Sequence, residues 1–526
     1  MSAMKTLRAS VAAAAYCAVL ALLAACGGGG GAGSPGGSNY LPSSTFAGKC
    51  APDNTLARDS AGNLLPRYAG GTLVDEKSWV RSYVDEAYLW YKEVPQVDAY
   101  AAEFIVSPPQ RALEAWFGAL KTPALTASGA RKDRFSFTLP TAQWNALAQS
   151  GVVGGYGVEW ALISRTAPRN IRAAYVEAQS PAASAGVVRG DDVRALIVDG
   201  VEIDVVNTTV ASEIARLNEV LFSPVDGSRA TFRLRGNNGV EREVTLTAAQ
   251  VTTTPVKEAK VLDAGGTKVG YLLFNDFIVP GEGQLKSAIQ GFQSAGVRDL
   301  VLDLRYNGGG FLYMASQLAY MIAPPSRTTG KTFERSIYSD KREAATNSPS
   351  SILQFQGTSS GVSGSNTVAN SPLPNLGLER VYLLTTGATC SASESVINGL
   401  RGVDIEVILL GAPTCGKPYG FTAKDNCGLS YFPVEFQGVN QKGFGEFADG
   451  FAPACAVGDD LQNPLGSEQE GLLAAALAYR GGASCAAITA RGPKVASDAR
   501  AGDSGAGSGT ATIVRPPARS NKYLTP

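Results

Sequence analysis

Residues 381–394 read VYLLTTGATCSASE, and this stretch decides the fold of the second half of the chain. The apolar and β-branched run at 381–385 predicts a buried strand. Ser391 and Glu394 have the spacing of a capping box, in which a serine opens a helix and a glutamate three residues later reaches back to the serine N–H. We therefore expect a strand that passes through a short loop into a helix over 391–401, with Ser391 at the junction.

Strands and helices alternate on both sides of this junction. Apolar runs and helical spacing predict strands over 269–274, 300–304 and 405–410 and helices over 284–295 and 312–322. Such alternation is typical of α/β layering, so we predict an α/β core over residues 257–486. Residues 324–376 interrupt the pattern; they are rich in Ser, Pro, Asn and Gly and are expected to form a surface insertion.

Two regions precede the core and one follows it. Residues 49–150 contain aromatic residues at helical spacing, among them Trp79 and Tyr83, which we interpret as core packing of a helical N-terminal domain. Residues 151–256 are rich in short β-prone runs and predict a separate β domain. Residues 487–526 are expected to be a flexible, disordered tail.

The β domain contains a distinctive segment at 180–193, which reads SPAASAGVVRGDDV and is followed by VDG at 198–200. This order of motifs resembles the core of PDZ domains, which bind peptide ends by adding a strand to a sheet edge. The resemblance implies a peptide-binding loop formed by Tyr156, Gly157 and Val158. A purely structural β domain is the alternative.

The chain contains no histidine. This excludes the Ser/His/Asp and Cys/His mechanisms, which are the commonest ways of activating a nucleophile. A hydrolase would need another base, and a lysine serves only where a mostly dry pocket lowers its pKa from about 10.4 toward 7 to 8.

Three expected strand ends carry residues suited to such chemistry. The strand over 381–385 leads to Ser391, and the N–H of Ala392 at the helix start is free to bind an oxyanion. The strand over 300–304 leads to RYNGGG at 305–310, where glycines allow a second N–H donor to approach. The strand over 405–410 leads to GAPTCGKP at 411–418, which contains Lys417.

These motifs together resemble the S41 family, the C-terminal processing proteases. The match consists of Asp-Leu-Arg-x-Asn-x-Gly-Gly at Asp303 to Gly310, Ser-Ala-Ser-Glu at Ser391 to Glu394, and Gly416-Lys417. The resemblance implies a helical N-terminal domain, a PDZ domain and a ClpP/crotonase-like α/β core, in an enzyme that cleaves polypeptides without a metal or other cofactor.

The same resemblance assigns roles to individual residues. It implies Ser391 as nucleophile, Lys417 as general base, an oxyanion hole formed by Gly308 or Gly309 with Ala392, and Asp303, Arg305 and Glu394 as supporting residues. One position departs from the family pattern: its best-known members carry a glutamine four residues after the lysine, where this chain has Phe421. The group that orients Lys417 is therefore open, with Glu394 and Thr414 as candidates.

The first residues predict export. Residues 1–25 combine basic residues with a short apolar run, as in a signal peptide, and the sequence LAAC at residues 23–26 resembles a lipobox. We expect Cys26 to be lipidated, residues 26–48 to be a flexible linker, and the protein to be held on the periplasmic face of the cell envelope, with the outer membrane preferred. The alternative is a signal peptide with an incidental cysteine.

Six cysteines remain after Cys17 and Cys26, and an even number in an oxidising compartment predicts disulfides. Their pairing is open; our hypothesis is Cys390–Cys415, Cys427–Cys455 and Cys50–Cys485. A zinc site is the weaker interpretation, because the sequence has no CxxC pair. The 46 basic and 46 acidic residues balance, so no nucleic-acid partner is expected.

Three other functions are weighed against the peptidase. A chain of this fold that no longer cleaves would be a lipid-anchored peptide-binding module. A nucleotide-binding P-loop is indicated by residues 411–417, but Pro418 stands where magnesium needs a hydroxyl. A penicillin-recognising enzyme needs a Ser-x-x-Lys motif, which we do not find outside the signal peptide.

Overall fold

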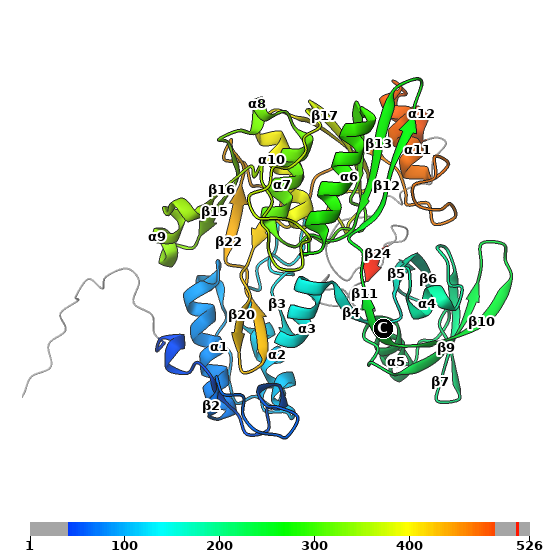
Figure 1. Ribbon diagram of the computed structural model, residues 1–526. Coiled ribbons are helices and arrows are strands. Elements are labelled where there is room, and N and C mark those ends of the chain that lie inside the picture. The colour runs from blue at the N-terminus through cyan, green and yellow to red at the C-terminus, as the bar shows by residue number, and fades with distance from the viewer. Residues whose placement is uncertain (1–39, 490–511, 515–526) are drawn as a thin grey trace, which may run out of the picture. The chain divides into compact units, whose positions relative to one another are not determined.

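The structure is a computed structural model that describes residues 40–489 and 512–514 (Figure 1). The expected signal peptide, Cys26, most of the linker and most of the tail lie outside the described residues. None of the helices in the described ranges has the length and apolarity that a membrane crossing requires.

A six-stranded sheet forms the centre of the α/β core. Its order is β12-β13-β14-β17-β18-β23, and all neighbours are parallel except β12 and β13. The strands are β12 (Val256–Asp263), β13 (Lys268–Phe274), β14 (Asp299–Asp303), β17 (Arg380–Thr385), β18 (Glu406–Gly411) and β23 (Cys455–Ala456). The strands predicted from the apolar runs are therefore confirmed, and the carboxyl ends of β14, β17 and β18 lie at one edge of the sheet.

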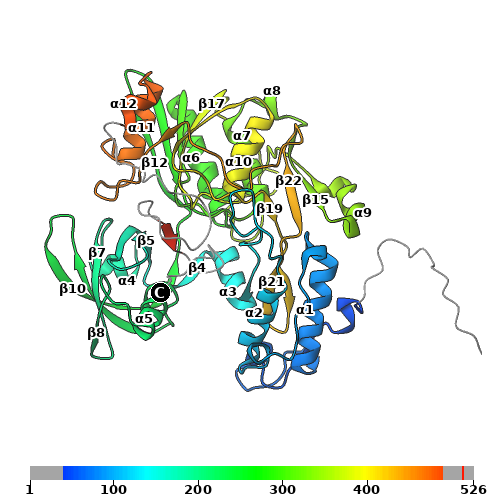
Figure 2. The same cartoon turned by 180° about the vertical axis from the view of Figure 1, so that it is seen from behind.

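Helices cover both faces of this sheet, which explains why its strands are apolar almost throughout. Leu302, Leu383 and Leu409 pack in one cluster with α6 (Gly281–Ala295), α7 (Leu312–Ile322) and α10 (Ala392–Gly402). The alternate residues Val301, Tyr382 and Ile408 pack in another cluster with α11 (Gly471–Arg480) and α12 (Cys485–Thr489). Figure 1 shows α6, α7 and α10 next to one another, and Figure 2 shows them from behind.

The prediction that residues 324–376 form a surface insertion is wrong for one strand. Strand β15 (Thr332–Tyr338) belongs to a four-stranded sheet with β16 (Ile352–Gln354), β19 (Tyr419–Gly420) and β22 (Phe436–Val439). Phe333 in β15 is 1% exposed and belongs to the same apolar cluster as α10. The serine and glycine around this strand conceal it in the sequence. Two short helices, α8 (Pro325–Thr328) and α9 (Glu343–Thr346), also lie in the insertion.

The N-terminal region is helical but shares a sheet with the core. Its helices are α1 (Leu73–Ala87), which begins with a capping box between Thr72 and Asp75, α2 (Pro109–Ala119) and α3 (Thr141–Asn145). Strands β1 (Lys49–Cys50) and β2 (Ala69–Gly70) pair with each other. Strand β3 (Phe137–Pro140) pairs with β21 (Leu429–Phe432), next to β20 (Lys424–Asn426), so residues from the two halves of the chain form one sheet.

The β domain has the order β10-β9-β7-β6-β5-β24, with β8 paired to β7. Its elements are β4 (Val152–Gly155), β5 (Val158–Ser164), β6 (Asn170–Val176), α4 (Pro181–Ser184), β7 (Asp192–Val198), β8 (Val201–Asp204), α5 (Ala211–Phe222), β9 (Arg229–Arg235), β10 (Glu241–Thr247) and β11 (Ala249–Thr252). Strand β24 (Thr512–Val514) pairs antiparallel with β5. This strand lies in the range expected to be a disordered tail.

Three disulfides join the six cysteines: Cys50–Cys427, Cys390–Cys415 and Cys455–Cys485. The predicted Cys390–Cys415 pair is confirmed, and the predicted Cys427–Cys455 and Cys50–Cys485 pairs are wrong. Cys427 lies in the turn between β20 and β21, whereas Cys455 lies in β23, which belongs to a different sheet. The fold therefore does not bring these two cysteines together.

Candidate active site

Ser391 lies between β17 and α10 in a strained backbone conformation. Its φ is 55° and its ψ is −117°, a region that residues with a side chain rarely adopt. Such strain persists only where the surroundings enforce it, and it is concentrated at functional sites. A sharp strand-to-helix turn of this kind holds a serine hydroxyl out of the fold, as in hydrolase nucleophile elbows.

The glycine loop after β14 lies directly against Ser391. A methyl group at Gly309 would be 2.7 Å from the Ser391 Cβ and 3.0 Å from the Ala392 nitrogen, so glycine is required. Asn307 fixes this loop: its amide donates to the Phe274 carbonyl, and its own carbonyl accepts from the Cys390 N–H at 3.0 Å. The three parts of the predicted oxyanion hole are therefore neighbours.

Gly308 and Gly309 differ in the use of their N–H groups. The Gly309 N–H donates to the Asn307 Oδ1 at 2.9 Å. In the described part of the chain, no acceptor is found for the N–H of Gly308 or of Ala392. Ala392 is fully buried, and Gly308 is half-buried. Gly308 and Ala392 are thus the pair available to stabilise an oxyanion.

Lys417 lies in a pocket that lowers the pKa of its amine. Burial lowers this pKa to about 8, and the negative charges of Asp133 and Glu394 offset the shift only in part. The Nζ is 4.0 Å from the ring centroid of Phe421 and 5.5 Å from that of Phe135. No carboxylate within residues 40–489 lies close enough to Nζ for an ion pair. A lysine in this state can release its proton near neutral pH.

Glu394 joins the serine and lysine loops through their backbones. Its Oε2 accepts from the N–H of Ser391 at 3.0 Å and from the N–H of Lys417 at 2.8 Å. Its Oε1 accepts from the Gly416 N–H at 2.8 Å and the Thr414 hydroxyl at 2.6 Å. The carboxylate is fully buried; burial raises its pKa, and these four hydrogen bonds oppose the rise.

The expectation that Glu394 or Thr414 holds the Lys417 ammonium is not met. The carboxylate binds the lysine backbone rather than its side chain, and the Thr414 hydroxyl donates to that carboxylate. The ring of Phe421, which stands at the position where a glutamine was expected, lies 4.0 Å from the amine. An aromatic face in this position attracts a cation by about 0.5–2 kcal/mol.

Asp303 and Arg305 lie where β14 (Asp299–Asp303) ends and the glycine loop begins. Arg305 is fully buried and forms ion pairs with Asp303 at 2.7 Å, Asp459 at 2.9 Å and Glu470 at 2.6 Å. The adjacent Tyr306 hydroxyl donates to Asp459. These contacts fix the start of the 305–310 loop without touching Ser391.

The N-terminal region contributes to the lysine pocket, which sequence patterns do not reveal. Phe135 faces the Lys417 amine, and the Asp133 carboxylate accepts from the Tyr88 hydroxyl at 2.6 Å and from the Phe135 N–H at 3.0 Å. The pairing of β3 with β21 brings this segment to the core. No local signal marks these residues, because the contact joins positions almost 300 residues apart in the sequence.

Tyr156, Gly157 and Val158 lead into the edge strand of the β domain. Tyr156 is 3% exposed and packs against Phe232, with ring centroids 5.4 Å apart. Gly157 has a φ of 77°, and a methyl group there would lie 2.1 Å from the Ser180 Cβ. Val158 begins β5, whose outer edge pairs with β24.

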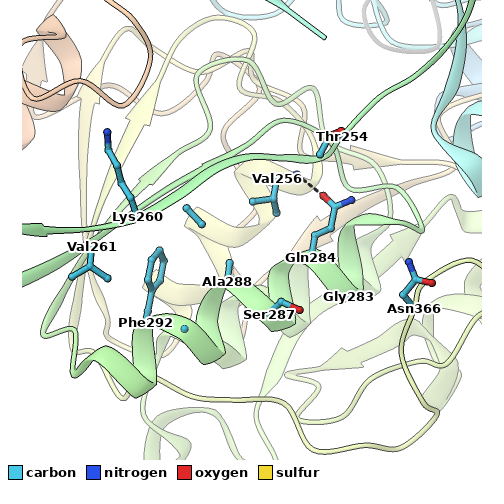
Figure 3. Close-up of a pocket in the computed structure, with 12 residues that line it drawn as sticks. Thr254, Val256, Lys260, Val261, Gly283, Gln284, Ser287, Ala288, Phe292 and Asn366 are labelled. Atoms are coloured by element: carbon cyan, nitrogen blue, oxygen red, sulfur yellow. Dashed lines mark hydrogen bonds between the residues drawn. The ribbon is translucent and has the colours of Figure 1, made fainter. Parts of the chain in front are cut away.

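A surface cavity of about 720 Å³ lies apart from these loops (Figure 3). It is bounded by β12 and α6, and the Val256 N–H donates to the Gln284 Oε1 across it at 2.9 Å. Its lining includes Gly283, Ser287 and Phe292 and none of the predicted site residues.

Comparison with known proteins finds similarity over the core. Residues 268–424 match the model of peptidase family S41. The chain is 27% identical over 214 residues to a carboxyl-terminal-processing protease of Synechocystis sp. PCC 6803, covering 40% of this chain and 48% of the relative. It is 26% identical over 239 residues to the protein of the same description from Picosynechococcus sp. PCC 7002, covering 45% and 48%.

These matches span about half the length of the curated relatives. A solved structure assigned to the S41 proteases, from Bacteroides fragilis NCTC 9343, is similar over a larger part. It superposes with a TM-score of 0.57 at 27% identity, covering 77% of this chain and 97% of that one.

Proposed function

The chain contains a peptidase S41 domain, and from this premise we propose that it is a serine endopeptidase with Ser391 as nucleophile and Lys417 as general base. The observation that carries the proposal is the shared oxygen of Glu394. The Glu394 Oε2 accepts from both the Ser391 N–H and the Lys417 N–H. The backbones of these two residues are therefore close to each other, although they lie in different loops.

The proposed reaction begins with the neutral amine of Lys417. The amine takes the proton of the Ser391 hydroxyl as its Oγ attacks the scissile carbonyl carbon. The N–H groups of Ala392 and Gly308 stabilise the resulting oxyanion. The Lys417 ammonium then protonates the leaving amine, and a water molecule, activated in the same way, hydrolyses the acyl-enzyme.

The β domain is proposed to deliver substrate. The edge of β5 accepts an extended segment, since β24 of this same chain pairs there in antiparallel register. A polypeptide substrate would bind by the same strand addition, with its end near Tyr156, Gly157 and Val158.

Two substitutions test the catalytic proposal. We expect Ser391→Ala and Lys417→Ala each to reduce the cleavage of unfolded casein by at least about 1,000-fold, because the nucleophile and its base act as a unit. Matched controls are Ser287→Ala and Lys424→Ala, which change exposed residues. Both controls should cleave at the wild-type rate.

The competing function is a peptide-binding module that does not cleave, and the replacement of the expected glutamine by Phe421 is the observation that favours it. The same assay decides between the two. Peptide binding to the wild type without any Ser391-dependent cleavage would support the peptide-binding function and contradict the peptidase function.

We also propose that the protein is anchored on the periplasmic face of the cell envelope through Cys26, with the outer membrane preferred. The support is the LAAC motif at residues 23–26. Cys26→Ala should release the protein from the membrane fraction or leave it unprocessed. Unchanged fractionation of this variant would contradict the anchor.

A further inference from the structure

One disulfide ties the two loops of the proposed catalytic dyad. Cys390 immediately precedes Ser391, and Cys415 lies two residues before Lys417; the two cysteines are bonded, with their Cα atoms 5.2 Å apart. The other two disulfides in the described part of the chain join Cys50 to Cys427 and Cys455 to Cys485, and neither connects these loops.

The disulfide reinforces contacts that are otherwise non-covalent. The Cys415 N–H donates to the Thr389 carbonyl at 3.0 Å, and Glu394 binds both loops as described above. The Cys415 Sγ lies 3.3 Å from the Glu394 Oε2, the oxygen shared by Ser391 and Lys417. The bridge therefore lies against the carboxylate that aligns the dyad.

We propose that Cys390 and Cys415 are positioning residues, whose disulfide sets the register of Ser391 against Lys417 and makes turnover depend on its oxidation. The inference rests on the proposed peptidase function. Cys390 is half-buried, so a small dithiol reductant can reach the bridge. In the reaction the S–S bond breaks, each cysteine gains a proton as a thiol, and the dithiol is oxidised to its own disulfide.

Reduction removes the covalent restraint between the loops. Bonded sulfur atoms are about 2.05 Å apart, whereas atoms in non-bonded contact need about 3.5–4.0 Å. The sulfur atoms must separate by about 1.5 Å. We infer that the loops take up part of this movement, and a displacement of about 1 Å at a reacting centre costs about 100-fold in rate. A disulfide that only stabilised the folded state would change the free energy of unfolding and leave the kcat of the folded enzyme unchanged.

The experiment measures kcat and KM on a fluorogenic peptide under oxidised and reduced conditions. The wild type is treated with dithiothreitol and alkylated, and peptide mapping by mass spectrometry identifies which bridges were opened. The double variant Cys390→Ala/Cys415→Ala is compared with the matched control Cys455→Ala/Cys485→Ala, with folding followed by circular dichroism and thermal melting.

The expected result is a selective loss of kcat. It should fall about 10- to 100-fold in the Cys390→Ala/Cys415→Ala variant and in wild type opened at that bridge, with KM changed less than about threefold. The control variant should keep its kcat, the site variant should no longer respond to dithiothreitol, and re-oxidation of unalkylated wild type should restore turnover.

Full kcat in wild type whose Cys390–Cys415 bridge is shown to be open would overturn the proposal. If the Cys390→Ala/Cys415→Ala variant does not fold, the kcat of the reduced wild type still tests the proposal. Absence of Ser391-dependent turnover in the oxidised wild type would instead reject the peptidase. The positioning claim would then be judged by hydrogen exchange at residues 390–393 and 414–417, which must increase on reduction if the bridge aligns these loops.

Discussion

Lys417 is suited to act as a base because of its surroundings rather than its own chemistry. An exposed lysine has a pKa of about 10.4 and carries almost no neutral amine at pH 7. Burial lowers the pKa of Lys417 to about 8, so roughly one molecule in ten holds the neutral form at pH 7. The rings of Phe421 and Phe135 lie 4.0 Å and 5.5 Å from the amine, and within residues 40–489 no carboxylate forms an ion pair with it.

This lowered pKa predicts the pH dependence of cleavage. The base must be neutral, so kcat/KM should rise tenfold per pH unit below about 8 and level off above it, because deprotonation of Lys417 is then complete. Initial rates between about pH 6 and pH 10 check this, under conditions where the fold is intact. A profile that is already flat at about pH 6.5 would assign the base role to another group.

The candidate site lies in loops that follow the strands of the central sheet. The predicted bounds of these strands and helices were accurate where they depended on the local pattern of apolar residues. The apolar runs predicted β14, β17 and β18, and the spacing of residues 312–322 predicted α7 with its observed ends. Convergence of Ser391, Gly309 and Lys417 followed from the parallel order of these strands. Strand β15 was missed because its apolar residues are sparse, and two disulfide pairs were missed because pairing depends on contacts far apart in sequence.

At the same scale, the pairing of β24 with β5 predicts competition for the proposed peptide-binding edge. A chain that lacks residues 505–526 should bind a labelled peptide of residues 508–516 about two- to tenfold more tightly, because the tethered competitor is gone. Fluorescence anisotropy gives the Kd. The matched control lacks only residues 516–526 and keeps β24; equal affinities of the two truncated chains would show that β24 does not compete.

The site as a whole is assembled from both halves of the molecule. The helical N-terminal region was expected to be a separate domain, yet its β3 pairs with β21 and its Asp133 and Phe135 surround Lys417. Sequence patterns report local periodicity and cannot show that residue 135 faces residue 417. This is why the positions of Ser391 and Lys417 after neighbouring strands were predictable and the N-terminal side of the lysine pocket was not.

A single substitution tests the influence of the N-terminal region on the base. Asp133 raises the pKa of Lys417, so Asp133→Asn should lower it and move the rise of kcat/KM to lower pH, by less than about one unit. The asparagine oxygen can still accept from the N–H groups of Phe135 and Ser136, which both bind the Oδ1. An unshifted profile would mean that this charge does not affect the pKa of the amine. Asp85→Asn, which removes the charge that pairs with Lys341, is the control.

The shared sheet of β3 and β21 also means that the lysine pocket is incomplete until both strands have been synthesised. A growing polypeptide presents Phe135 and Asp133 long before the segment that carries Lys417 and β21 has been made, and domains otherwise tend to fold from the N-terminus onward. Until the later segment docks, the lysine is hydrated and keeps its ordinary protonation. Formation of the pocket that lowers the pKa of Lys417 therefore requires both halves of the chain.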